Sequence, residues 1–218
     1  MNEFDPQAKH RKLQAKYFND KVKIFTRAIP GEIVERTKRI VDLSLTNTTD
    51  KILDVGTGTG VLIEHFLEFG ILAQNILGLD LTLGMLVQAG QNYPQVNFCH
   101  SDFLDFNNQS KFYLNNELIH FNYDLFNIIF FNACFGNIFN QDAAIAKAYT
   151  LINPGGKIVI SHPMGAQFVQ KLHAFEPHIV PYPLPDLPVL NYFCQTYNLK
   201  LDLFEDESEF YLAILVKI

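Results

Sequence analysis

The clearest chemical signal in this chain is a glycine-rich segment, KILDVGTGTGVLIEHF, at residues 51–66. An apolar, strand-like run ends at Val55, glycines follow at positions 56, 58 and 60, and a helical pattern begins behind them. Glycines in such an arrangement let the backbone turn tightly and let a ligand approach the peptide groups without a Cβ in the way. The segment therefore predicts a ligand-binding turn at the end of a strand.

The glycine spacing differs from the dinucleotide fingerprint G-x-G-x-x-G. Counted from Gly56, the third glycine of that fingerprint would fall on Val61. Asp54 stands two residues before the first glycine, where a carboxylate is well placed to meet an ammonium group and badly placed beside a phosphate. The turn thus favours a ligand with a positively charged group, and a purely structural glycine turn is the alternative.

Two further acids follow the next two strand-like runs. Asp80 directly follows the run 75–79 and lies 20 residues after Gly60. An acid at this distance from the glycines in such folds accepts hydrogen bonds from ribose hydroxyls. Asp102 comes just after the run 96–99, where it can accept a hydrogen bond from an adenine amino group. Asp80 alone could be a helix cap, and Asp102 alone could be an exposed loop acid. Together with Asp54, however, they fall at the carboxyl ends of successive strands, the edge at which open parallel sheets bind ligands.

Strand-like runs alternate with helical segments along most of the chain. The pattern predicts helices over 8–27, 31–45, 61–68, 83–92 and 142–151, and strands over 51–55, 75–79, 96–99, 125–132 and 157–161. The stretch 103–122 is polar, and residues 153–156 form a predicted turn. Such alternation implies right-handed crossovers and a parallel sheet covered by helices on both faces.

The end of the chain departs from this alternation. The strand-like runs 199–204 and 210–216 are separated only by a short acidic turn, which permits nothing but a hairpin. We therefore predict a doubly wound α/β fold with a mostly parallel seven-stranded sheet and an antiparallel last strand. Residues 1–218 are expected to form one domain: a helical cover at 1–48, a cofactor-binding core at 49–162, a helical and proline-rich cover at 163–198, and the hairpin at 199–218.

Composition excludes several protein classes. Of the 218 residues, 48% are hydrophobic and 18% are charged, which is enough apolar material for a core and argues against disorder. No apolar run approaches the ~20 residues that a membrane-spanning helix needs, and the N-terminus has no apolar signal core. The cysteines at 99, 134 and 194 are too scattered for a disulfide framework or a CxxC metal site. These features predict a soluble, cytoplasmic protein.

Positive charge is concentrated near the N-terminus. Ten of the 17 lysines and arginines lie in residues 1–40, against five acids, so this segment carries +5 and the rest of the chain −11. A basic segment can attract phosphate-bearing partners, or it can be a solvated helix face. The lack of aromatic–basic interleaving and the overall charge of −6 favour the second interpretation and argue against nucleic acid as a partner.

Several motifs taken together resemble those of class I S-adenosylmethionine-dependent methyltransferases. They are ILDVGTGTG, GLD with Met85 five residues on, SDF, YDLFNIIFFNACFGNI and LINPGGKIVIS, and they span about residues 48–162, with the hairpin at 199–217 extending the match. The resemblance implies a Rossmann-like methyltransferase fold and S-adenosyl-L-methionine as cofactor, with S-adenosyl-L-homocysteine as product. It also implies the transfer of a methyl group to an acceptor.

The resemblance also assigns the binding residues. We expect no metal, because no acid follows the fourth strand before Asp142. Asp54 with Gly56, Thr57, Gly58 and Gly60 would hold the methionine part of the cofactor, and Asn132 would lie beside the sulfonium. Asp80 would bind the ribose hydroxyls. Leu81 and Met85 would pack against the adenine face, and Asp102 with Phe103 would bind the adenine edge. Enzymes that methylate amino groups of nucleic acids carry two prolines after such an asparagine, and both are missing here. The remaining pattern is most similar to small-molecule methyltransferases acting on quinones, acids or phenols.

For the acceptor, we predict a position between Asn132, Phe135, His162 and the N-terminal helix that bears Tyr17. His162 follows the fifth strand and could orient or deprotonate a hydroxyl or carboxyl group near neutral pH. It could equally be a histidine that caps the strand end. Two other functions stay open at this point: an RNA or protein methyltransferase that uses the basic N-terminal arm, and a non-catalytic cofactor-binding protein.

Overall fold

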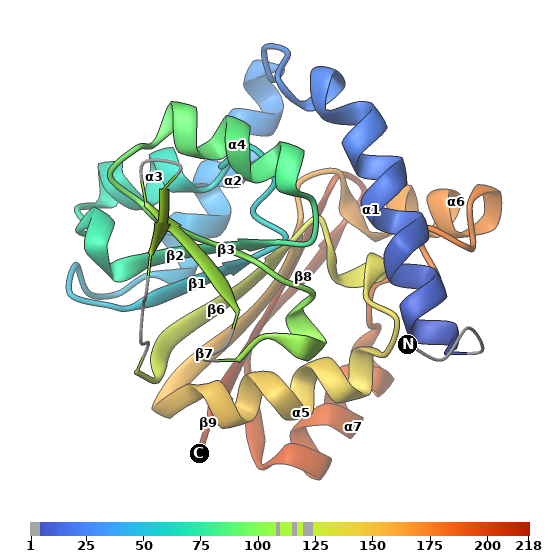
Figure 1. The fold of residues 1–218 in the computed structure, drawn as a ribbon. Coiled ribbons are helices and arrows are strands. Elements are labelled where there is room, and N and C mark those ends of the chain that lie inside the picture. Colours follow the sequence, from blue (N-terminus) through green and yellow to red (C-terminus); the bar gives the residue numbers. More distant parts are fainter. Residues whose placement is uncertain (1–4, 108–109, 115–116, 120–123) are drawn as a thin grey trace.

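The computed structural model describes residues 5–107, 110–114, 117–119 and 124–218. A single sheet runs through the molecule, with helices against both of its faces (Figure 1). Its strands are β1 (Ile52–Val55), β2 (Ile76–Asp80), β3 (Asn97–His100), β4 (Lys111–Leu114), β5 (Glu117–Ile119), β6 (Phe126–Asn132), β7 (Ile152–His162), β8 (Leu199–Glu207) and β9 (Phe210–Lys217). They lie in the order β5-β4-β3-β2-β1-β6-β7-β9-β8.

The centre of the sheet is parallel and its order reverses beside β1. Neighbours from β3 through β2, β1 and β6 to β7 all pair in parallel, whereas β9 pairs antiparallel with both β7 and β8. The doubly wound fold and the antiparallel last strand are therefore confirmed. Because β2 and β6 flank β1 on opposite sides, the carboxyl end of β1 is the switch point at which such sheets leave a crevice.

The predicted number of seven strands is wrong, since β4 and β5 extend the sheet to nine. Both strands are antiparallel and lie at the β3 edge, within the stretch predicted only as polar. The parts of that stretch at 108–109, 115–116 and 120–122 lie outside the described residues. Phe112 of β4 is buried opposite Cys99, and its ring meets that of Phe106 edge-on at 6.3 Å. Burial of Phe112 on one face of the sheet thus stabilises β4 as a strand, although the surrounding stretch is mostly polar.

Six helices cover the two faces of the sheet within the described residues. One face carries α2 (Gly31–Ser44), α3 (Ile63–Phe69) and α4 (Leu83–Asn92), and the other carries α5 (Gln141–Leu151), α6 (Gly165–Phe175) and α7 (Leu187–Tyr197). Successive strand residues face opposite layers, so Phe130 packs with the first set and Phe131 with the second. Strand β7 is longer than predicted, because residues 153–156 form an irregular segment inside it where its register with β6 shifts.

Helix α1 (Pro6–Phe25) lies outside these two layers, at one end of the strands (Figure 1). It begins at Asp5, whose side chain accepts a hydrogen bond from the Gln7 N–H, and at Pro6, whose fixed φ suits the first helical position. Among the helices that the structure describes, none combines the length and apolar character needed to cross a membrane. The role of α1 is to cover the carboxyl edge of the sheet.

Candidate functional site

A cavity of about 390 Å³ opens at the carboxyl ends of β1, β2 and β6, beneath α1. Its floor is the glycine turn after β1 and the first residues after β2, β3 and β6, and its cover comes from α1 and the segment that joins α1 to α2. The predicted residues that line it are Asp54, Gly56, Thr57, Gly58, Asp80, Leu81, Met85, Asp102, Phe103 and Asn132. The strand-end acids and the glycine turn therefore do meet at one place, as the topology requires.

Asp54, at the end of β1, is a buried carboxylate with an unusual environment. Only 2% of the residue is exposed, and its Oδ2 has no hydrogen-bond partner among the described residues. Burial raises the pKa of Asp54 to about 7, and the nearby Asp80 carboxylate adds to this rise. A cationic ligand group would meet an unsatisfied acceptor here, which is the environment that the sequence predicted for an ammonium.

Asp80 fastens the glycine turn to the start of α4. Its Oδ2 accepts a hydrogen bond from the Gly58 N–H at 2.9 Å, and its Oδ1 accepts one from the Thr82 N–H at 2.7 Å. Burial raises its pKa, and the two backbone donors partly oppose that effect. A carboxylate offers about four acceptor sites, so both oxygens can still accept from ligand hydroxyls. Asp80 is thus both a local cap and a cavity residue.

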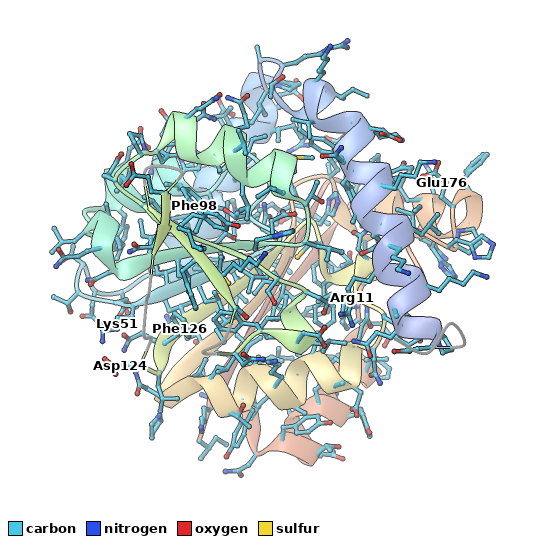
Figure 2. The ribbon with its side chains drawn as sticks, viewed as in Figure 1. Arg11, Lys51, Phe98, Asp124, Phe126 and Glu176 are labelled. Atoms are coloured by element: carbon cyan, nitrogen blue, oxygen red, sulfur yellow. The ribbon has the colours of Figure 1, made fainter. Side chains whose placement is uncertain are left out.

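Asp102 combines the same two roles after β3. Its Oδ1 accepts a hydrogen bond from the Leu104 N–H at 2.7 Å and so caps a single 3₁₀ turn at Phe103–Asp105. Its Oδ2 lies 3.6 Å from Nε of Arg11, which also pairs with Asp105. Arg11 lies on the side of α1 that faces the sheet (Figure 2). Asp102 is therefore a local cap, which the sequence did not predict, as well as a residue of the cavity lining.

Unsatisfied polar atoms concentrate in this cavity. Among the described residues, four buried side-chain nitrogen or oxygen atoms lack a hydrogen-bond partner, namely Oδ2 of Asp54, Oγ1 of Thr57, Oγ1 of Thr82 and Nε of Arg11. The first three belong to residues that line the cavity. Buried polar groups without partners cost about 1–3 kcal/mol each, so their clustering points to a polar ligand that completes them. The described residues contain no group of three or more His, Cys, Asp or Glu that could hold a metal ion.

The end of β6 gives the cavity an oriented amide. Oδ1 of Asn132 accepts a hydrogen bond from the Ser161 hydroxyl at 3.0 Å, and these two residues are register partners on β6 and β7. The next residue, Ala133, has a φ of 54°, an uncommon conformation for a residue with a side chain. Its N–H donates to the Ser161 carbonyl at 2.8 Å, which holds the turn in place. Ser161 therefore positions the end of β6, a role that its sequence context did not reveal.

Four predicted residues, all within the described part of the chain, do not line the cavity: Gly60, Tyr17, Phe135 and His162. Tyr17 donates a hydrogen bond to Glu176, which lies on the other side of α1 from Arg11 (Figure 2). Phe135 is fully buried, and its ring meets that of Phe131 at 5.3 Å. These two side chains belong to the packing of α1 and of the core.

His162 caps the end of its strand, which was the alternative interpretation of this residue. The residue is 6% exposed, its Nδ1 accepts a hydrogen bond from the Met164 N–H at 3.1 Å, and burial lowers its pKa to about 4. The ring is thus neutral at neutral pH and caps the end of β7. The predicted acceptor pocket between Asn132, Phe135, His162 and Tyr17 therefore needs correction, because three of these four side chains are engaged elsewhere.

Gly60 has a conformational role, and this gives a first prediction. Its φ is +93°, and a Cβ would lie 2.7 Å from Cε2 of Tyr93. We expect Gly60→Ala to lower the free energy of unfolding by about 2–4 kcal/mol, from backbone strain and overpacking together. Chemical denaturation measures it, with Gly155→Ala as the control, since Gly155 has a φ of +74° and open space around it. Equal losses in the two variants would contradict the assigned clash.

A buried glutamine that no sequence pattern indicates attaches α1 to the fold. Gln14 is buried, and its Nε2 donates to the backbone carbonyls of Asn137 and Ile179 at 2.6 and 2.7 Å. A glutamine on an otherwise polar helix looks like any solvated residue, so only the tertiary structure reveals this function. His10 adds a contact of its Nε2 with the same Asn137 carbonyl at 2.9 Å.

Removing that attachment should loosen α1. We expect Gln14→Leu to lower the free energy of unfolding by about 1–3 kcal/mol, because two hydrogen bonds that join α1 to buried carbonyls are lost. The Asn137 carbonyl keeps its contact with His10, and the Ile179 carbonyl keeps the Asn137 side-chain amide as a donor. Hydrogen exchange of the α1 amides should accelerate as well. The control is Lys12→Leu, on the exposed side of the same helix. Unchanged stability and exchange in Gln14→Leu would show that α1 is held by other contacts.

The comparison with protein families decides the identity of this fold. The sequence model described as "Methyltransferase domain" matches residues 25–200. The chain belongs to the methyltransferase-domain family. The resemblance found in the sequence is thereby confirmed, and so is the expectation of an enzyme; a non-catalytic binding protein is no longer the alternative. In this methyltransferase the matched region holds the whole sheet up to the start of β8.

Solved structures agree on the fold. The methyltransferase resembles magnesium protoporphyrin IX methyltransferase from Synechocystis PCC 6803 with bound SAM, at 10% identity, a TM-score of 0.67 and full coverage of both chains. It also resembles a chain in the complex of the Haloferax volcanii Trm112 methyltransferase activator with a methyltransferase, at 14% identity, 97% coverage of each chain and a TM-score of 0.65. Ribosomal protein L11 methylase from Lactobacillus delbrueckii subsp. bulgaricus follows at 13% identity, with 88% and 81% coverage and a TM-score of 0.56. The comparison with curated proteins finds no match.

Proposed function

We propose that this methyltransferase transfers the methyl group of S-adenosyl-L-methionine to a small-molecule acceptor and releases S-adenosyl-L-homocysteine. The observation that carries the proposal is the cavity at the switch point, where Asp54, Thr57 and Thr82 present buried polar atoms without partners. The family match and the neighbours solved with bound SAM and SAH support the same cofactor.

The residues that line the cavity fit the parts of this cofactor. Asp54 would accept hydrogen bonds from the ammonium group, beside the backbone of the glycine turn. Asp80 would accept from the ribose hydroxyls, and Met85 would pack against the adenine ring. Asp102 would meet the adenine amino group through Oδ2, since its Oδ1 already accepts from the Leu104 N–H.

Orientation and exclusion of water account for the catalysis that these residues can supply. When bound, S-adenosylmethionine provides a methyl group on a sulfonium, which an acceptor atom displaces in line. Asn132, held by Ser161, would fix the position of the reacting groups at the end of β6. Helix α1, attached through Gln14, would close the site to water. Such positioning can lower the barrier substantially without any protein nucleophile.

The remaining cavity walls favour a small, apolar acceptor. Its hydrophobic lining residues include Phe18, Phe25, Ile29, Ile33, Ile138 and Phe139. Among the described residues of the lining, the acids are Asp54, Asp80 and Asp102, all of them on the cofactor side, so a cationic amine acceptor would find no further carboxylate. A cavity of about 390 Å³ under a helix suits a small molecule better than a polymer.

Charge pairing on α1 and α2 also supports a small acceptor over RNA. Several basic residues of this segment have acidic partners: Arg11 with Asp102 and Asp105, Arg36 with Glu32 and Glu209, Lys38 with Asp42, and Arg39 with Glu205 and Glu207. Their positive charge is therefore compensated within the fold. A polyanion would have to compete with these carboxylates for the same side chains.

Transfer of tritium from methyl-labelled S-adenosylmethionine tests the proposal. The purified enzyme is incubated with separate small-molecule, RNA and protein fractions of a cell extract, and each fraction is counted after removal of the cofactor. We expect label in the small-molecule fraction. Label confined to RNA or protein would instead support the alternative that uses the basic N-terminal arm.

A further inference from the structure

A buried histidine near the cavity takes no part in the function proposed so far. His65 lies on α3 and is 6% exposed. Its Nε2 is 3.1 Å from Oγ1 of Thr37 on α2, and its Nδ1 is 3.4 Å from Oε2 of Glu68, whose side chain is 54% exposed. A carboxylate, an imidazole and a hydroxyl thus form a continuous hydrogen-bonded series across two helices.

The series connects the cavity to the surface. Thr37 is 1% exposed to solvent and lines the cavity, whereas Glu68 lies at the outer end of the series. The neighbouring Arg36 donates from Nη1 to the carbonyl of Pro163 at 3.2 Å, and Pro163 also lines the cavity. Because Pro163 follows β7, whose Ser161 pairs with Asn132, Thr37 lies on the side of the cavity where the acceptor is expected.

We propose that Thr37, His65 and Glu68 form a proton relay that removes a proton from the hydroxyl group of the acceptor. The proposal rests on the proposed function and assigns the acceptor to the class of molecules with an ionisable O–H group. Thr37 is the member that touches the acceptor, and His65 and Glu68 act through it. In carboxylate–imidazole–hydroxyl arrangements the imidazole accepts the proton of the hydroxyl, and the carboxylate fixes the imidazole tautomer that can do so. The relay proposed here adds one proton transfer, from the acceptor to the hydroxyl oxygen.

The tautomer determines the direction of proton flow. Because Oε2 of Glu68 lies 3.4 Å from Nδ1 of His65 and can accept its proton, this contact favours the Nδ1–H tautomer, in which Nε2 carries a lone pair toward Thr37. The Thr37 hydroxyl has one proton and three acceptors within reach. They are Nε2 of His65 at 3.1 Å and the carbonyl oxygens of Ile33 and Val34 at 2.9 Å each. Rotation of the hydroxyl from a backbone carbonyl to Nε2 would therefore direct the Thr37 proton to the imidazole.

Protons and electrons balance in the proposed step. The acceptor oxygen forms a bond to the methyl carbon, and the electron pair of the breaking S–C bond stays on sulfur. The acceptor O–H proton passes to Thr37 Oγ1 while the Thr37 proton passes to Nε2 of His65. The resulting imidazolium, stabilised by Glu68, returns its proton to solvent at the exposed end of the series.

The first test is a measurement of the His65 tautomer that needs no acceptor. Ring nitrogen shifts are recorded on histidine-labelled enzyme saturated with S-adenosylhomocysteine, and His65→Gln assigns the signals. We expect a proton on Nδ1 and none on Nε2, with a shift toward the Nε2–H form in Glu68→Gln. Glu64→Gln, an exposed carboxylate on the same helix, is the control. An Nε2–H tautomer in the wild type would overturn the relay.

The second test separates a relay from a structural contact between α2 and α3. The probes are 4-methylphenol, which is un-ionised at neutral pH, and 2,4-dinitrophenol, which is ionised. We expect His65→Gln to lower kcat about 100-fold for the first phenol and less than about threefold for the second, because a base helps only where a proton must leave. Thr37→Val should lower kcat for 4-methylphenol as His65→Gln does, and Thr37→Ser, which restores the hydroxyl, should recover part of that loss.

The outcomes distinguish this proposal from the proposed function. Equal losses of kcat for both phenols, or weaker binding of S-adenosylhomocysteine in His65→Gln, would overturn the relay and leave methyl transfer intact. Failure of the wild type to bind S-adenosylhomocysteine would overturn the proposed function itself. If neither phenol is methylated, the tautomer alone decides, with the Nδ1–H form supporting the relay and the Nε2–H form contradicting it.

Discussion

Asp80→Ala is expected to bind S-adenosylmethionine about 30- to 1,000-fold more weakly than the wild type, a loss of about 2–4 kcal/mol. The variant loses the hydrogen bonds from the ribose hydroxyls to a buried carboxylate. It also loses the acceptor for the Gly58 and Thr82 N–H groups, so the glycine turn is held less firmly. Calorimetric titration of the folded variant measures the dissociation constant.

Two variants make this prediction specific. Asp80→Asn keeps the shape of the side chain and one carbonyl oxygen, so we expect a smaller loss of affinity than for alanine. Asp124→Ala removes an exposed acid that pairs with Lys51 at 2.7 Å, away from Arg11 and α1 (Figure 2), and it should bind the cofactor as the wild type does. An unchanged dissociation constant for Asp80→Ala would remove Asp80 from the site.

Affinity for S-adenosylmethionine is expected to fall about 50-fold between pH 7 and pH 5, with a slope that approaches tenfold per pH unit toward pH 5. Burial raises the pKa of Asp54 to about 7 in the free protein, so the carboxyl is mostly protonated at pH 5. A neutral carboxyl cannot pair with the ammonium of the ligand, which stays charged throughout this range. Titration calorimetry at several pH values measures the slope.

The matched variant for the pH series is Asp54→Asn. The variant should bind S-adenosylmethionine weakly, and its affinity should depend little on pH between 5 and 7. If the affinity of the wild type is also independent of pH in this range, the role of Asp54 is contradicted. Stability of the ligand-free protein should change in the opposite direction. Because the folded pKa lies above the usual value of 3.8, the contribution of Asp54 to stability is present below pH 4 and is lost as the pH rises through 7.

The cofactor side of the site could be predicted from the sequence because its signals are local. Glycines at 56, 58 and 60 and the acids Asp54, Asp80 and Asp102 each stand at the end of a strand that the apolar pattern identifies. Parallel pairing of β1 with β2 and β6, and of β2 with β3, then brings these ends to one edge. Position along a strand was therefore enough to assemble them.

The acceptor side could not be predicted in the same way, because it depends on side-chain direction. Phe135 and His162 follow strands that end beside the cavity, yet a short helical turn directs Phe135 into the core and the Met164 N–H occupies His162. Thr37, Gln14 and Phe139 reach the cavity from segments whose sequence shows only helix or loop character. Their placement comes from the packing of α1 and α2 over the sheet edge.

Parallel calorimetric titrations of the wild-type enzyme with S-adenosylhomocysteine and with NAD⁺ test the central claim most directly. Both ligands carry an adenosine. S-adenosylhomocysteine offers an ammonium group to Asp54 and has no phosphate, whereas NAD⁺ has no such ammonium group and would bring a pyrophosphate to the glycine turn. We predict saturable one-site binding of S-adenosylhomocysteine and weaker binding of NAD⁺. Tighter binding of NAD⁺ would contradict the assignment of the cavity to S-adenosylmethionine.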